Sequence, residues 1–131
     1  MSTTTQPKLF LIGPGFIGGT FLKHLIATRG LNAYHLQVLT RRQEQADQLR
    51  KLGIQEPILG GLDDTDVIAR YASQADVVIH AATADHAPSA LAVAKGLSQR
   101  DPSKGRAIYI HTSGTRWVYP RVSSLLLTLR S

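Results

Sequence analysis

The sequence lacks cysteine, and none of its apolar runs is long enough to cross a membrane. Without cysteine, disulfide bonds, thiolate catalysis and cysteine-ligated metals are excluded. The longest apolar runs fall far short of the roughly 20 residues that a membrane-spanning helix needs. No basic residue precedes Lys8, and glycine and proline interrupt the apolar stretch after it. We therefore expect no signal peptide, no membrane partner and a cytoplasmic location.

Dense basic clusters are also lacking, although the formal charge of the 131 residues is +6. Residues 1–99 contain nine Lys and Arg against eight Asp and Glu, whereas residues 100–131 contain six against one. The excess therefore lies near the C-terminus, with few aromatic residues among the basic ones, and we expect no nucleic-acid partner. A hydrophobic content of 43% and a charged content of 18% fit one globular domain.

The most informative segment is a glycine-rich turn between an apolar strand, Leu9 to Ile12, and a segment with apolar residues at helical spacing. In the pattern Gly13-x-Gly15-x-x-Gly18, the first glycine permits a tight turn and the second lets the backbone approach phosphates. The third lets the helix pack close to the strand. Free N–H groups at the helix N-terminus attract an anion. The segment predicts a site for a dinucleotide pyrophosphate; the alternative is an ordinary glycine loop.

Strands and helices alternate along the chain. We expect strands over 9–12, 35–40, 58–59, 76–80 and 107–111, and helices over 18–29, 43–52, from about 63 onward, and over 88–99. This alternation predicts the α/β class with a Rossmann-type doubly wound parallel sheet of about five strands, in the order 3-2-1-4-5, in a single truncated domain. A ligand crevice is then expected at the carboxyl ends of strands one and four.

The segment 116–131 does not continue this alternation, so we predict a dinucleotide-binding domain over 1–115 and an atypical tail over 116–131. Residues 123–129 could form a strand, a short helix or neither. A sixth strand is expected to follow a further helix, and there is no room for both. The tail could cover the edge of strand five or leave it open, and an open edge would favour self-association.

Two arginines follow strand two, about 22 residues after Gly18, where an acid would bind the ribose 2′-hydroxyl of NAD and arginine accommodates the 2′-phosphate of NADP. Arg41 and Arg42 stand there, and no acid occurs before Glu44. Guanidinium groups match phosphate in charge and in two-pronged hydrogen bonding. We therefore predict NADP rather than NAD, the alternative being that these arginines only begin a solvated helix.

The ends of strands four and five carry small and hydroxyl residues. Ala81, Ala82 and Thr83 would let the backbone pass beside the cofactor ribose, although they could equally form a tight strand-to-loop transition. Ser113, or alternatively Thr112, could bind a substrate carbonyl at the nicotinamide end of the crevice. The bland alternative is a turn whose hydroxyl groups cap local backbone.

Histidines also stand at these strand ends. His80 ends strand four and His111 ends strand five, near Asp85 and His86. Such residues could hold a metal, but no tight ligand spacing supports that. We expect His80 to be a packed histidine and predict no metal site.

Together, these segments resemble the N-terminal half of the extended and atypical short-chain dehydrogenase/reductase superfamily, near its epimerase-like and NmrA-like branches. The matching segments are Gly15-Phe-Ile-Gly18, Val38-Leu-Thr-Arg41, Gly60-Gly-Leu-Asp-Asp64, Ala75-Asp-Val-Val-Ile-His-Ala-Ala82 and Ile110-His-Thr-Ser-Gly114. The resemblance implies five roles. Gly13, Gly15, Phe16, Ile17 and Gly18 line the pyrophosphate; Arg41 meets the 2′-phosphate; Leu62 lies by adenine and Ala81, Ala82 and Thr83 by the ribose; Ser113 is the active-site hydroxyl.

The chain departs from that superfamily at decisive places. Gly61 replaces the aspartate that usually contacts adenine, and the catalytic Tyr-x-x-x-Lys is missing, because Ser123 stands four residues after Tyr119 and no lysine follows Lys104. We expect no C-terminal substrate domain either. We therefore expect an NADP(H)-binding domain of an oxidoreductase or epimerase that is inactive alone, with an unknown small-molecule substrate. The alternatives are a non-catalytic NADP-sensing module, as the NmrA-like resemblance permits, and a truncated remnant without activity.

Overall fold

The computed structural model describes residues 6–13, 16–28, 33–82, 86–112 and 127–130, with only the backbone for 16–18 and 127–130. The strands are β1 (Lys8–Ile12), β2 (His35–Thr40), β3 (Glu56–Leu59), β4 (Val77–His80), β5 (Ile108–His111) and β6 (Leu127–Arg130). The helices are α1 (Phe16–Ala27), α3 (Gln43–Lys51), α4 (Thr65–Gln74) and α5 (Ala87–Ser98), with a short 3₁₀ turn at Pro102–Lys104. Each described element up to β5 lies within a few residues of the expected one.

The six strands form one sheet in the order β3-β2-β1-β4-β5-β6. The first five are parallel, which confirms the predicted Rossmann-type order 3-2-1-4-5. β1 lies between β2 and β4, so successive connections leave it in opposite directions. The carboxyl ends of β1 and β4 therefore form the topological switch point at which such sheets bind ligands.

β6 corrects one expectation. It pairs antiparallel with β5, with Leu129 opposite Tyr109, a pairing that does not require a crossover helix. The expectation that a sixth strand needs a further helix was wrong because it assumed a parallel strand. β6 also covers the edge of β5, the arrangement that the sequence left open.

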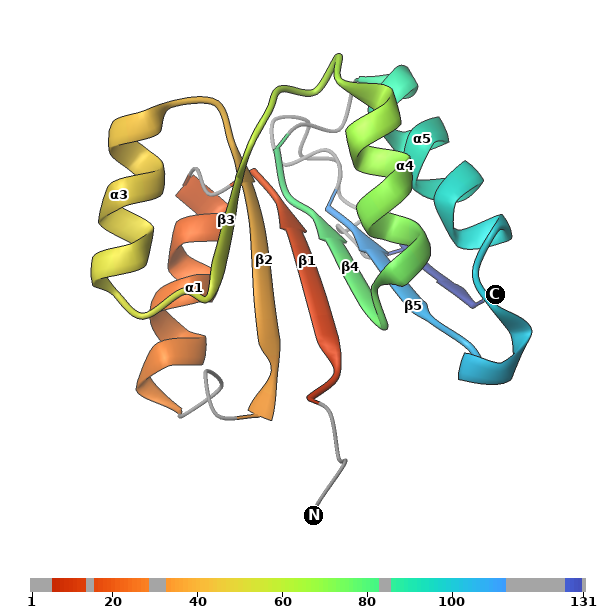
Figure 1. Cartoon of the computed structure of the whole chain (residues 1–131), viewed down its shortest axis with the longest axis horizontal. Helices are drawn as coiled ribbons and strands as arrows, with labels where there is room; N and C mark the ends of the chain where they lie inside the picture. Colours follow the sequence, from red (N-terminus) through yellow and green to blue (C-terminus); the bar gives the residue numbers. More distant parts are fainter. Residues whose placement is uncertain (1–5, 14–15, 29–32, 83–85, 113–126, 131) are drawn as a thin grey trace, which may run out of the picture.

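Helices cover both faces of the sheet, α1 and α3 on one face and α4 and α5 on the other (Figure 1). The buried side chains of β1 alternate between these layers. Leu9 and Leu11 pack in a cluster with α1 and α3, whereas Phe10 and Ile12 pack in a cluster with α4 and α5. A strand that is apolar on both faces is typical of a parallel sheet between two helical layers. No helix among the described residues has the length and apolarity to span a membrane.

The amino end of the sheet is closed by a buried arginine. Arg100 is only 8% exposed, and its guanidinium donates to the Ala75 carbonyl at 2.5 Å, to Asp76 Oδ1 at 2.7 Å and to the backbone carbonyls of Gly105 and Lys104 at 2.9 and 3.1 Å. Asp76 Oδ2 accepts the backbone N–H of Lys8 at 2.8 Å. Burial raises the pKa of Asp76, but the hydrogen bonds from Arg100 and Lys8 outweigh it and leave the pKa below its usual value. This cluster links β1, β4 and the segment after α5.

Candidate functional site

The turn after β1 lies directly against the end of β4. Gly13 has a φ of 90°, which side-chain-bearing residues rarely adopt, and a Cβ added there would lie 2.6 Å from the Cα of Ala82. The backbone N–H of Ala81 donates to the carbonyl of Ile12 at 2.8 Å and extends the β1–β4 pairing. Gly13 therefore keeps a bare backbone at the switch point, as expected from the sequence.

α1 begins immediately after this turn, at Phe16, and has no acidic residue in its first turn. The partial positive charge of its N-terminus is therefore not neutralised by its own side chains, which suits an anion. Gly15 and the side chains of Phe16, Ile17 and Gly18 lie outside the described residues, so their predicted phosphate contacts stay predictions.

The two predicted phosphate-binding arginines stand at the carboxyl end of β2. Thr40 ends the strand as a buried residue, and its hydroxyl donates to Gln45 Oε1 of α3, which anchors the strand end. Arg41 and Arg42 follow and are exposed. Within the described part of the chain, neither guanidinium has a hydrogen bond or ion pair. Both positive charges are thus available to an external anion.

The side chain of Arg41 lies against the loop between β3 and α4. A Cβ added at Gly61 would be 3.6 Å from Cδ and 3.8 Å from Cγ of Arg41. The loop is held beside β2 because Gly60 N–H donates to the Thr40 carbonyl at 2.9 Å, and Gly61 N–H donates to Asp64 Oδ2 at 2.6 Å. The end of β2 and the loop after β3 therefore lie side by side at the carboxyl edge of the sheet.

The other residues predicted to contact the cofactor differ in how exposed they are. Leu62, expected beside adenine, is half-buried and packs against the α4–α5 core cluster. Ala81 is buried in the other cluster, whereas Ala82 is exposed beside Gly13. The structure therefore brings Gly13 and Ala82 together; Thr83 lies outside the described residues, as does Ser113.

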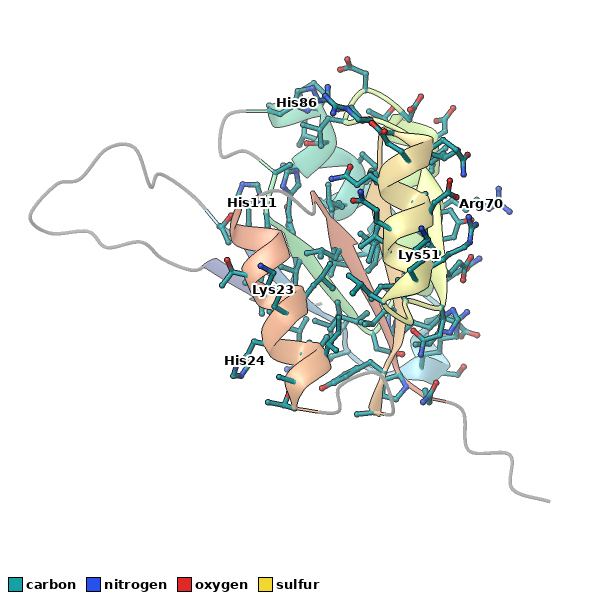
Figure 2. The ribbon with its side chains drawn as sticks, turned by 90° about the vertical axis from the view of Figure 1, so that its left-hand side faces the viewer. Lys23, His24, Lys51, Arg70, His86 and His111 are labelled. Carbon is teal, nitrogen blue, oxygen red and sulfur yellow. The ribbon has the colours of Figure 1, made fainter. Side chains whose placement is uncertain are left out.

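A polar chain that was not predicted from the sequence crosses the same end of the molecule. Asp63 Oδ1 lies 3.0 Å from Nε2 of His86, and Nδ1 of His86 lies 2.9 Å from Oγ of Ser89. The same Oγ lies 2.8 Å from Nε2 of His80. Only the tertiary structure reveals this chain, because its members come from the β3–α4 loop, β4 and α5. Figure 2 shows His86 and His111 toward the end where the parallel strands finish, with His24 at the opposite end of α1.

A hydrogen bond from the backbone fixes the tautomer of His86. His86 Nδ1 accepts the backbone N–H of Ser89 at 3.1 Å, so Nε2 carries the proton that it donates to Asp63. The Ser89 hydroxyl lies 3.0 Å from the His86 carbonyl and 2.8 Å from His80 Nε2. His80 Nδ1 is buried and has no partner within the described residues.

Burial and charge keep His80 neutral. It is fully buried, and desolvation, followed by repulsion from His111 and His86, lowers its pKa to about 4. The rings of His80 and His111 lie 4.6 Å apart between centroids. The expectation that His80 is a packed histidine is therefore confirmed.

Asp63, His86 and Ser89 have the order of a hydrolase triad, but the nucleophile is inaccessible. Ser89 is fully buried in the first turn of α5, and its hydroxyl donates to a backbone carbonyl. A nucleophilic serine must reach a substrate carbonyl beside oxyanion donors. We therefore assign a structural role, and not a catalytic one, to these hydrogen-bonded residues.

The described hydroxyl groups near the end of β5 are bound within the protein. Thr112 donates from its N–H and its Oγ1 to the carbonyl of His80, at 3.0 and 3.2 Å, so it bonds to the end of the neighbouring strand and not to local backbone. The hydroxyl of Tyr109 lies 2.8 Å from Nδ1 of His111, and burial raises the pKa of Tyr109 to about 12. Such a tyrosine is a poor proton donor, so it does not replace the missing catalytic tyrosine. Within the described residues no group of three potential metal ligands occurs.

The sequence of residues 10–94, from β1 into α5, matches the 3-beta hydroxysteroid dehydrogenase/isomerase family. The chain belongs to this family. The family is one of the extended short-chain dehydrogenase/reductases, which confirms the resemblance drawn from the sequence, and membership implies a nicotinamide dinucleotide cofactor. The bare turn at Gly13 and the unpaired arginines fit such a group.

Relatives extend beyond this chain. The oxidase ucsJ of an Acremonium species is 34% identical over 110 residues, which are 82% of this chain and 31% of that protein. The chain thus spans about a third of the length of this relative. Among solved structures, ChuY, an anaerobillin reductase of Escherichia coli O157:H7, has a TM-score of 0.57 at 18% identity, covering 70% of this chain and 45% of that one. A dipicolinate synthase subunit from Bacillus halodurans has a TM-score of 0.58 at 19% identity, covering 87% and 34%. Likenesses at these identities show the fold.

Proposed function

We propose that this chain is the NADP(H)-binding part of an oxidoreductase or epimerase of the 3-beta hydroxysteroid dehydrogenase/isomerase family. The observation that supports NADP is Arg41, which is exposed, unpaired within the described residues and placed beside Gly61 at the end of β2. A guanidinium there has the geometry and charge for a 2′-phosphate. Arg42 adds a second positive charge at the start of α3.

The proposed contacts follow the carboxyl edge of the sheet. Gly13, Gly15, Phe16, Ile17 and Gly18 hold the pyrophosphate at the N-terminus of α1, Leu62 lies by adenine, and Ala81, Ala82 and Thr83 lie by the ribose. When bound, the nicotinamide supplies hydride transfer. The protein binds and orients it, and Ser113 is the proposed hydroxyl contact to substrate, within a dinucleotide-binding domain over 1–115.

Turnover is a separate matter from binding. Tyr109 is buried and its pKa is raised to about 12, and the sequence contains no Tyr-x-x-x-Lys. We therefore propose that the isolated chain binds cofactor without turning over a carbonyl substrate. A second candidate is an NADP-sensing module, which needs only binding and a partner surface.

Calorimetric titration of the chain with NADPH and NADH tests the proposal. We expect tighter binding of NADPH, and we expect Arg41→Asp to weaken NADPH binding by roughly 10- to 100-fold, the worth of a charged hydrogen bond. NADH binding should change little, because NADH has no 2′-phosphate. Equal losses for both cofactors would refute the role of Arg41.

A second variant tests the pyrophosphate position. Gly15→Val should abolish binding of both cofactors while the protein stays folded, since a branched side chain blocks the approach of the phosphates. Circular dichroism verifies folding. Undiminished affinity in a folded Gly15→Val protein would contradict the site, and absence of binding to the unmodified chain would refute the proposed function itself.

A further inference from the structure

Two acidic residues of the loop beside Arg41 form hydrogen bonds with other groups. Asp64 accepts the backbone N–H of Gly61 at 2.6 Å, and Asp63 accepts a hydrogen bond from Nε2 of His86 at 3.0 Å. The loop between β3 and α4 therefore contains two carboxylates, and neither forms an ion pair with Arg41 within the described residues. The positive charge of Arg41 stays available although the surrounding loop is acidic.

Gly61 is the position that maintains this arrangement. A Cβ added to it would lie 3.6 Å from Cδ of Arg41, so the aliphatic part of the arginine rests on the bare backbone of this residue. A carboxylate on a side chain at position 61 would be within reach of the guanidinium. Such a carboxylate would neutralise Arg41 inside the protein and would repel a phosphate at the same place.

We infer that Gly61 determines the cofactor specificity of this protein, because it seats Arg41 and leaves its charge for a 2′-phosphate. The inference rests on the proposed function, since it concerns the same crevice. The inference adds a second residue to the selection of NADP. Arg41 attracts the 2′-phosphate, and Gly61, which has no side chain, places no competing carboxylate beside that arginine.

Position 61 tolerates the substitutions that test this inference. Gly61 has no positive φ, so residues with a side chain can adopt its backbone conformation. An added Cβ meets its nearest neighbours at ordinary contact distance, 3.6 Å or more. Gly61→Asp introduces the charge, Gly61→Asn introduces nearly the same shape without it, and Gly61→Ala introduces the Cβ alone.

Titration of each variant with NADPH and NADH gives the result. We expect Gly61→Asp to lower the ratio of NADPH to NADH affinity by about tenfold or more, and Gly61→Asn and Gly61→Ala to preserve it within about threefold. An equal loss of the ratio in Gly61→Asn would show that shape and not charge matters and would overturn the inference. So would an unchanged ratio in Gly61→Asp.

A double-mutant cycle with Arg41→Ala tests whether the effect passes through the arginine. If it does, Gly61→Asp changes the ratio much less in the Arg41→Ala background than in the unmodified chain. The same fold-change in both backgrounds would overturn the inference. These results are distinct from failure of the proposed function, in which the unmodified chain binds neither cofactor or does not prefer NADPH.

Discussion

The two ends of the sheet differ in whether their polar side chains have partners within the protein. At the amino end, Arg100 and Asp76 satisfy each other and neighbouring backbone groups, and the arginine is only 8% exposed. At the carboxyl end, Arg41 and Arg42 are exposed without partners among the described residues, and His80 Nδ1 is buried without one. A protein that only had to fold would gain from pairing these groups. We infer that the amino end serves stability and the carboxyl end serves binding.

The largest effect that this contrast predicts is at the amino end. Arg100→Ala should lower the free energy of unfolding by about 3–5 kcal/mol, because Asp76 and several carbonyls would lose their buried donor. Urea unfolding measures it, with Arg50→Ala as control, since Arg50 forms only an exposed 3.7 Å pair with Asp47. The folded fraction should bind cofactor as before. A decrease of less than about 1 kcal/mol in the free energy of unfolding would mean that the Arg100 cluster contributes little to stability.

Acid should act next most strongly, through the carboxyl end. His80 has a pKa of about 4 in the folded protein, whereas an unfolded chain takes up this proton near pH 6.5. The unfolded state therefore binds more protons in this window, and the free energy of unfolding should fall by about 3 kcal/mol as pH falls from 6.5 to 4. Urea unfolding at several pH values measures the slope.

His80→Gln is the control for that experiment, because it removes the titrating group. Its unfolding free energy should change much less with pH over the same window. If both proteins have the same slope, another group is responsible and the protonation assigned to His80 is wrong.

A smaller effect is expected from the polar chain. Ser89→Ala removes the hydrogen-bond partner of His80 Nε2 and should lower the free energy of unfolding by about 1–3 kcal/mol. Ser98→Ala is the matched control on the same helix, because its exposed hydroxyl donates only to the carbonyl of Lys95, and its effect should stay within about 0.5 kcal/mol. Similar decreases in the free energy of unfolding for both variants would show that the hydrogen bonds of Ser89 to the two histidines do not stabilise the protein.

The smallest effect on stability is expected at Asp63, the exposed end of this series of hydrogen bonds. The side chain of Asp63 is 95% exposed, so its bond to His86 is surrounded by water. Asp63→Asn should change the free energy of unfolding by less than about 1 kcal/mol. A thermal unfolding midpoint lowered by many degrees would show instead that the chain acts as one cooperative unit.

The predictable part of this protein is that encoded by short, local patterns. The apolar strands, the glycine turn at Gly13 and the helices that begin near Phe16 and Gln43 follow from residues close together in the sequence. Parallel order follows from the alternation of strand and helix. β6 was not predictable in the same way, because its partner β5 lies far enough away in the sequence that only pairing geometry decides between parallel and antiparallel.

The candidate site was predictable to the same extent. Arg41 was identified from its distance to the glycine turn, but nothing in the sequence indicates that it rests on Gly61. No sequence motif indicates the hydrogen-bonded series Asp63, His86, Ser89 and His80, because the distances between these residues in the sequence match no known pattern. Their chemistry depends on which hydrogen bonds form.

Local sequence is enough to specify a Rossmann-type sheet with a bare glycine turn and two arginines at its carboxyl edge. These features depend on the periodicity of apolar residues and on glycine, which act over a few neighbouring positions. Three further features arise only from the folded arrangement: β6 closes the sheet, His80 is neutral, and the charge of Arg41 has no acidic partner in the loop beside it. Each of these results from distances between residues far apart in the chain, because burial and electrostatic interactions depend on separation in space.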